Sequence, residues 1–232
     1  MQNNIPEDLE KSLGINDLVP VDNNRSSSEE LKIIKKYSDE NLDIISKNLN
    51  TINEEEKRGL IVNLIAALDY YVHGIIIWEI TQITLNQFPE GKKYSDIKIK
   101  IKFLKEFKKS NFFDEPEIKK EIIKEIRYNT YQKWEDIRYG LSLILPKEVN
   151  SKIGELTSGK PSPAIFQTEK LEEINEKRNL IVHHFDREYE NEYVRNDFDL
   201  DCQKSFGLIK LIIDSIHKIV EDYDNTQPEN SN

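Results

Sequence analysis

The spacing of hydrophobic residues along the chain predicts helices over most of its length. Apolar residues recur three and four positions apart, whereas stretches that alternate apolar and polar residues are scarce. The first long helix is expected from Ser27 or Ser28 to about Asn48. Its apolar positions are Leu31, Ile34, Tyr37, Leu42 and Ile45. Because the chain holds only 8 Gly and 8 Pro, we predict an all-α fold.

The second expected helix is the longest and the most apolar. It begins after Asn53, whose side chain can cap it, and the glutamates of its first turn suit the positive end of the helix dipole. It continues over residues 54–88 and is apolar on most sides, so we expect it to be the central core helix. Gly59 and Gly74 within it are expected to mark close approaches by neighbouring helices.

Three further helices are expected in the second half of the chain. One opens at Pro116 and continues to Pro146, one is capped by Thr168, and the last begins at Asp197 or Asp199. The expected buried face of the last helix is Phe206, Ile209, Leu211, Ile212, Ile216 and Ile219. A loop is expected over residues 147–168. We divide the chain into an N-terminal helical extension and linker (1–50), a helical domain (51–223) and a disordered tail (224–232).

The charge of the chain restricts its partners. A net charge of -10 argues against a protein that coats nucleic acid non-specifically. Locally, Lys92 to Lys109 holds eight lysines against Asp96 and Glu106, a charge of +6. Lysines of this run could hold an RNA backbone, and a solvated helix face is the other interpretation. The candidates for RNA contact are Lys98, Lys102 and Lys105.

The sequence also predicts a compartment. Cys202 is the only cysteine, so an intramolecular disulfide is excluded and a reducing compartment is favoured. The first residues hold no apolar segment typical of a signal peptide. The longest apolar run, near Ile75 to Ile80, is interrupted by Glu79 and is shorter than a bilayer-spanning segment. We therefore expect a cytoplasmic protein without a membrane segment.

The stretch 171–186, LEEINEKRNLIVHHFD, holds the richest chemistry of the chain. Arg178 interrupts an apolar stripe on the expected helix. The stripe consists of Leu171, Ile174, Ile181 and Phe185. A guanidinium on an apolar stripe is costly unless it meets an anion, a hydrogen-bond partner or a facing subunit.

Arg178, Asn179 and His183 together suit chemistry on a phosphodiester. Histidine transfers protons near neutral pH, and arginine offers a fixed fork of donors to phosphate oxygens. Five residues along a helix correspond to about 140° of rotation, so Arg178 and His183 do not share a face, whereas Asn179 and His183 do. We therefore expect that the helix bends or ends near His183, or that a second subunit completes the site.

Structural roles for these residues remain open. Arg178 and His183 could be an interhelical ion pair and a surface histidine. His184 and Asp186 lack a recognised metal-ligand geometry, so no metal site is predicted. His73 and His217 lie in apolar helices and are expected to be packed and hydrogen-bonded.

Three aromatic residues near position 130 also have two interpretations. Tyr128, Tyr131 and Trp134 could stack on bases, although aromatic residues at helical spacing are usually core.

Three segments resemble the HEPN superfamily, and most closely its RiboL-PSP-type subfamily. The first is RNLIVHHFD (178–186), with an arginine, four intervening residues, a histidine and an aspartate, Asp186, three residues later. The second is ALDYYVH (67–73), which resembles the opening of the first core helix of that subfamily. The third is TYQKWEDIRYGLSLI (130–144), which resembles the subfamily's second helix with its aromatic–glutamine start. The resemblance covers roughly residues 53–220.

The resemblance implies an up-and-down four-helix bundle that acts as a metal-independent endoribonuclease without a cofactor. It implies a homodimer in which two motif helices form a composite site, with Arg178 and His183 catalytic and Asn179 positioning them or the phosphate. Substrate contacts are then expected from His184, Asp186, Tyr131, Gln132 and Trp134. Such a protein would cleave RNA through the 2'-hydroxyl as a toxin or antiphage effector, restrained by an antitoxin or defence partner. The other interpretation is a non-catalytic HEPN module that dimerises or binds a nucleotide or a protein.

Overall fold

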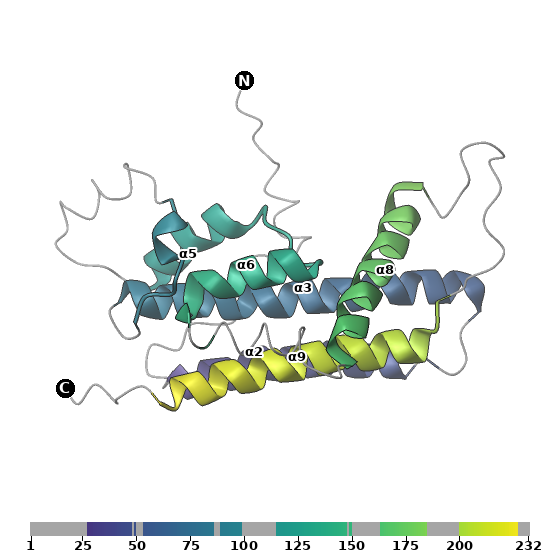
Figure 1. Ribbon diagram of the computed structural model, residues 1–232, viewed down its shortest axis with the longest axis horizontal. Coiled ribbons are helices and arrows are strands. Elements are labelled where there is room, and N and C mark those ends of the chain that lie inside the picture. Colours follow the sequence, from purple (N-terminus) through teal and green to yellow (C-terminus); the bar gives the residue numbers. More distant parts are fainter. Residues whose placement is uncertain are drawn as a thin grey trace, which may run out of the picture.

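The computed structural model describes most of the expected helices. It describes residues 27–47, 49, 53–85, 89–98, 115–147, 149, 163–184 and 200–226, without the side chains of 27, 28, 54, 163–167 and 184. These residues form six α-helices and one short 3-10 helix, and none of them lies in a strand (Figure 1). The all-α fold class is confirmed.

Three long helices, α2 (Ser27–Ser46), α3 (Glu54–Thr84) and α9 (Cys202–Asp224), pack side by side. α3 and α9 run in the same direction, because Tyr71 lies beside His217 and the side chain of Glu79 meets that of Asp224 further along both helices. α2 runs in the opposite direction. The first segment of the chain that the structure describes therefore belongs to the same core as the later helices.

The remaining helices cover the other sides of α3. α5 (Glu115–Ile126) and α6 (Trp134–Ile144) pack against it, and η2 (Tyr94–Asp96) contacts α6. α8 (Pro163–His184) contacts α3 and α9 and crosses both at a steep angle (Figure 1). α3 is thus the central helix, as the sequence predicts.

α3 resembles a membrane-spanning helix in length and composition, although Glu79 interrupts its apolar run. Residues 55–84 are long and apolar enough to cross a bilayer by length and composition alone. However, 61% of the most apolar window is buried against the rest of the protein, and the buried residues include Glu79. This burial is typical of the core helix of a soluble protein.

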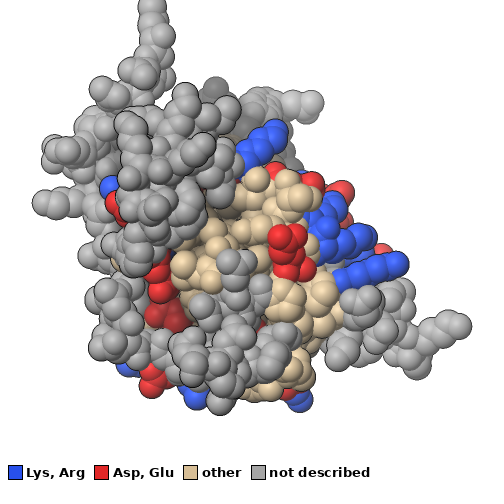
Figure 2. All heavy atoms as spheres, turned by 90° about the vertical axis from the view of Figure 1, so that its left-hand side faces the viewer, with Lys and Arg blue, Asp and Glu red and all other residues tan. Residues whose placement is uncertain are grey.

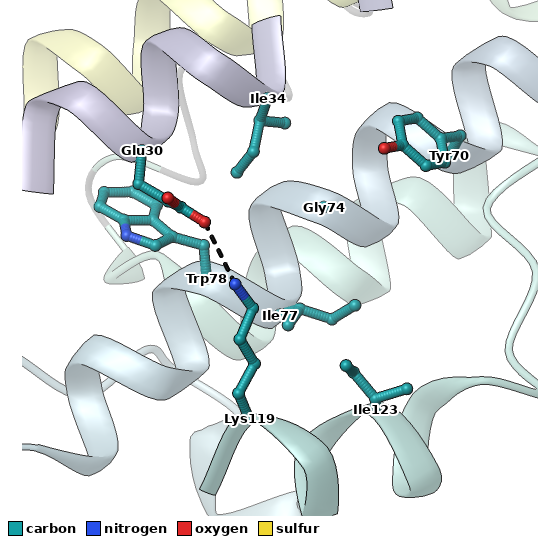
Figure 3. Close-up of a pocket in the computed structure, with 8 residues that line it drawn as sticks. All are labelled: Glu30, Ile34, Tyr70, Gly74, Ile77, Trp78, Lys119 and Ile123. Carbon is teal, nitrogen blue, oxygen red and sulfur yellow. Dashed lines mark hydrogen bonds and ion pairs between the residues drawn. The ribbon is translucent and has the colours of Figure 1, made fainter. Parts of the chain in front are cut away.

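The start of α3 forms as its sequence predicts. The Asn53 side chain accepts a hydrogen bond from the Glu56 backbone N–H (2.9 Å), and the Glu56 carboxylate accepts one from the Asn53 N–H (2.8 Å). Of the two glycines in α3, Gly74 marks a close approach, because a Cβ there would lie 3.0 Å from Ile34 (Figure 3). The expectation for Gly59 is wrong, because no described residue lies within 4 Å of a Cβ built there.

The prediction of one helix from Pro116 to Pro146 is wrong, because this segment forms two helices. α5 ends at Ile126 and α6 begins at Trp134, and the backbone N–H of Tyr131 in the connection donates to the Asp69 carboxylate on α3. That bond ties the connection to a residue far away in the sequence. A helix through residue 131 would place this N–H inside its own turn instead.

The predictions of two helix starts and of one buried residue are also wrong. α8 begins at Pro163, so Thr168 lies inside the helix, and α9 is capped by Asp201 instead of Asp197 or Asp199. Leu211 is 47% exposed on α9 instead of buried. Most of the expected loop 147–168, the whole lysine run after Lys98 and residues 227–232 of the expected tail lie outside the described residues.

Candidate active site

Arg178 and Asn179 contact each other on α8. The Arg178 Nη1 donates a hydrogen bond of 2.9 Å to the Asn179 Oδ1, and both residues are half-buried. The Arg178 Nε is buried and, within the described part of the chain, has no hydrogen-bond partner. Leu171 and Ile174 are fully buried on the same helix, so the predicted apolar stripe that Arg178 interrupts is confirmed for these residues.

His183 lies at the exposed end of the same helix. α8 ends at His184, and Val182 is 42% exposed although it lies only four residues from Arg178. The helix end therefore extends beyond the bundle that buries its earlier turns (Figure 1). Arg178 is half-buried and His183 is exposed, which agrees with the different faces that their spacing predicts.

Two further polar residues of α8 are buried, although neither is predicted from the sequence as a site residue. Asn175 is 2% exposed and Lys177 is 7% exposed. Asn175 lies one turn before Arg178, and its Oδ1 has no hydrogen-bond partner among the described residues. Its place beside Ile174 on the apolar stripe is the signal that could have identified it.

The other two HEPN-like segments are joined to each other. Asp69 accepts a hydrogen bond from the Tyr131 backbone N–H, and the His73 ring packs edge-on against the Tyr131 ring with centroids 4.6 Å apart. The His73 Nδ1 donates to the Asp69 backbone carbonyl at 2.9 Å. These contacts hold the connection before α6 against α3 and include no residue of α8.

The aromatic residues near position 130 divide into buried and exposed ones. Tyr131 is 1% exposed and Trp134 is 8% exposed, so both lie in the core and present no free ring face to a base in this structure. Gln132 is half-buried next to them, and Tyr128 is 71% exposed on the connection between α5 and α6. Tyr128 is therefore the member of this group that is open to solvent.

The remaining expected contact residues are only partly described. Lys98 is exposed, whereas Lys102, Lys105 and Asp186 lie outside the described residues, and α8 includes His184 without its side chain being described. Figure 2 shows several described Lys and Arg side chains along the right-hand edge of this face, with acidic side chains among them.

The other histidines are packed against aromatic rings. His73 is hydrogen-bonded, as expected. His217 is half-buried beside Tyr71, with ring centroids 6.3 Å apart, and burial lowers its pKa. Its Nδ1 lacks a hydrogen-bond partner among the residues that the structure describes, which differs from the expectation. In the same residues, no group of three or more His, Cys, Asp or Glu side chains is arranged to hold a metal ion.

An apolar hollow lies away from these residues. It is formed by α2, α3 and α5, and an ion pair of 3.1 Å between Glu30 and Lys119 closes one end (Figure 3). The apolar residues around it include Ile34, Ile77 and Ile123. No residue of α8 lines it, so it is separate from Arg178 and His183.

No protein-family model, curated protein or solved structure matches the chain. The HEPN resemblance therefore rests on the three sequence segments alone, and the activity that it implies is a proposal.

Proposed function

We propose that the chain is a metal-independent, cytoplasmic endoribonuclease of the HEPN type. The observation that supports this most directly is the Arg178–Asn179 hydrogen bond on a helix whose exposed end carries His183. This arrangement offers a held guanidinium and an accessible imidazole on consecutive turns. Metal-independent cleavage of RNA needs proton transfer and positive charge at the phosphate, and these two groups can supply them.

The proposed reaction uses the ribose 2'-hydroxyl as the nucleophile. A histidine accepts the 2'-hydroxyl proton while the 2'-oxygen forms a bond to phosphorus, and a protonated histidine donates a proton to the leaving 5'-oxygen as the P–O5' bond breaks. The products are a 2',3'-cyclic phosphate and a 5'-hydroxyl. The Arg178 guanidinium stabilises the extra negative charge on the phosphorane, and Asn179 holds the guanidinium in place.

The two proton transfers favour a homodimer. The described site offers one exposed histidine, and a single imidazole cannot accept and donate a proton in the same step. A second copy of the chain would supply the second histidine if the projecting ends of the two α8 helices met. The 42% exposure of Val182 leaves apolar surface available for that contact.

The biological setting follows from the resemblance. An enzyme that cleaves cellular RNA requires restraint, so we propose a toxin or antiphage effector that is held inactive by an antitoxin or defence partner. A net charge of -10 is consistent with a discrete RNA site and not with a broad basic surface.

One observation favours a second candidate, a non-catalytic dimerisation or binding module. The Arg178 guanidinium is half-buried and bonded to its own neighbour, as expected for an arginine that has only a structural role. In that case the exposed end of α8 would serve as a docking surface alone.

Cleavage of RNA in excess EDTA distinguishes the two candidates. Purified wild-type protein is expected to cleave total cellular RNA and to leave 2',3'-cyclic phosphate ends, whereas His183→Ala and Arg178→Ala lose at least about 100-fold in rate. Glu176→Ala, an exposed change on the same helix, serves as the control and should keep full activity. Retained activity in His183→Ala would remove His183 from the reaction.

If the purified wild-type protein does not cleave RNA, one more measurement is needed. If expression of the wild-type chain arrests growth and His183→Ala relieves the arrest, the enzyme is restrained in the purified state. If neither chain is toxic and neither cleaves RNA, the binding module is the correct interpretation.

A further inference from the structure

Two acidic side chains are buried together where the end of α9 meets α3. Glu79 on α3 is 0% exposed, and Asp224 is the last residue of α9. All four carboxylate oxygens are buried, and no donor from the described residues reaches any of them. Buried carboxylates without donors are rare in folded proteins because the charged form loses its hydration.

Within the described part of the chain, no cationic group acts on this pair. On α9, the negative charge of Glu221 acts on Asp224, and burial together with the pair raises the pKa of the Tyr223 hydroxyl to about 12. On α2 and α5, the charged residues beside Trp78, the neighbour of Glu79, are Glu30 and Lys119, which pair with each other (Figure 3).

The end of α3 adds no charge either. There the Tyr94 hydroxyl from η2 shares a hydrogen bond of 2.8 Å with the Thr84 hydroxyl. None of the described groups that act on the pair is a cation, and Lys119 is already paired with Glu30, so ionisation of both carboxyls would leave two uncompensated negative charges in the interior.

A proton shared between the two carboxyl groups would allow them to form a hydrogen bond with each other. Two ionised carboxylates are both acceptors and repel each other, whereas a protonated Glu79 can donate a hydrogen bond to Asp224. We propose that the Glu79–Asp224 pair is a proton-dependent latch that holds the last turn of α9 on α3. The latch is independent of the Arg178–His183 site, because it joins different helices and includes no residue of α8.

The two carboxyl groups differ in how readily they ionise, and this difference determines which of them keeps the proton. Burial, with a smaller contribution from Asp224, raises the pKa of Glu79 well above its usual value. Burial and the charge of Glu221 raise the pKa of Asp224 to about 7, against the opposing effect of its hydrogen bond to Glu79. Glu79 is therefore the donor, and Asp224 is the group that ionises near neutral pH.

The raised pKa of Asp224 determines how the stability of the last turn depends on pH. Its contribution to stability is complete below the pKa of an unfolded aspartate, about 4, and is lost as the pH rises toward about 7. Above that pH, Asp224 carries a buried negative charge at the C-terminal end of a helix, close to Glu221, where the helix dipole is also unfavourable. The last turn of α9 should therefore be held more tightly in mild acid than in mild alkali.

Hydrogen exchange of the last turn of α9 tests the latch. After correction for the intrinsic exchange rate, protection of the amides of residues 220–226 in the full chain should fall about tenfold between pH 6 and pH 8. Asp224→Asn should abolish this pH dependence, since the amide does not ionise. Asp222→Asn removes one charge from the same turn at an exposed position and should leave the pH dependence unchanged.

A direct titration keeps the proposal testable if Asp224→Asn does not fold. In the wild-type chain, the side-chain carboxyl carbon signal of Asp224 should titrate near pH 7. Titration of Asp224 near pH 4, or protection of the last turn that does not change with pH in the wild type, would overturn the latch.

Discussion

At Gly140 the structure leaves no room for a side chain. A Cβ at this position would lie 2.5 Å from the Tyr131 ring and 2.5 Å from the Ile76 side chain, both of which are buried. Gly59 is also helical, but a Cβ there meets no described residue within 4 Å. The two glycines therefore form a matched pair for substitution by alanine.

We predict opposite effects of alanine at these two glycines. Gly140→Ala should lower the free energy of unfolding by about 1–3 kcal/mol, because buried neighbours must move to admit a methyl group. Gly59→Ala should raise it by about 0.5–1 kcal/mol, because alanine loses less backbone entropy in a helix. Urea unfolding of the two variants and the wild type measures both. Equal shifts in the same direction would contradict the packing at Gly140.

Single residues were predictable where their own helix determines their environment. The half-burial of Arg178 and the exposure of His183 follow from their different faces on one helix. Gly74 and Gly59 look alike in the sequence, and only the position of Ile34 on another helix distinguishes them. Glu79 interrupts an apolar run in the sequence, but its meeting with Asp224 depends on how α3 and α9 are aligned.

At the scale of whole helices, the break between α5 and α6 depends on one carboxylate. Asp69 accepts the Tyr131 N–H, and the Tyr131 ring then packs against His73. Together these contacts hold the start of α6 on α3.

Removal of the Asp69 carboxylate should loosen this junction. Asp69→Ala leaves the Tyr131 N–H without its acceptor, which should cost about 1–3 kcal/mol of unfolding free energy. Asp69→Asn keeps an acceptor oxygen at the same place and should lose less. Thermal unfolding followed by circular dichroism compares the two, and a smaller loss in Asp69→Ala than in Asp69→Asn would show that the hydrogen bond is not the stabilising feature.

Helix ends were predictable where the cap is local. α3 begins where Asn53 indicates, because this cap uses residues within three positions. The end of α5 was not predictable, since the acceptor that determines it lies 62 residues away from Tyr131. Thr168 is a good cap by type, but Pro163 also suits a first turn, and the helix starts there.

At the scale of the whole molecule, hydrophobic spacing predicts the all-α class and the central place of α3, but not how the helices cross. The steep crossing of α8 leaves its last turns outside the bundle (Figure 1). Apolar Val182 is exposed there, and the proposed dimer would bury it.

A charge on the projecting end of α8 should separate the proposed dimer. Val182→Glu is expected to yield a monomer and to reduce RNA cleavage at least about tenfold without loss of helix content, because a buried unpaired charge at an interface is costly. Leu211→Glu changes a similarly exposed residue, 47% against 42%, on α9 and should leave both properties intact. Light scattering after size-exclusion chromatography measures the oligomeric state. A Val182→Glu dimer with full activity would place the contact elsewhere.

The central position of α3 has a consequence for synthesis of the chain. α3 is complete at Thr84, whereas α9, which covers one of its sides, begins only at Cys202. A growing chain therefore carries an apolar helix of bilayer length while, among the helices that the structure describes, only α2 has already been made to cover it. During that interval α3 is exposed to chaperones and to membrane-targeting factors that recognise long apolar segments, until the last helix emerges and covers it.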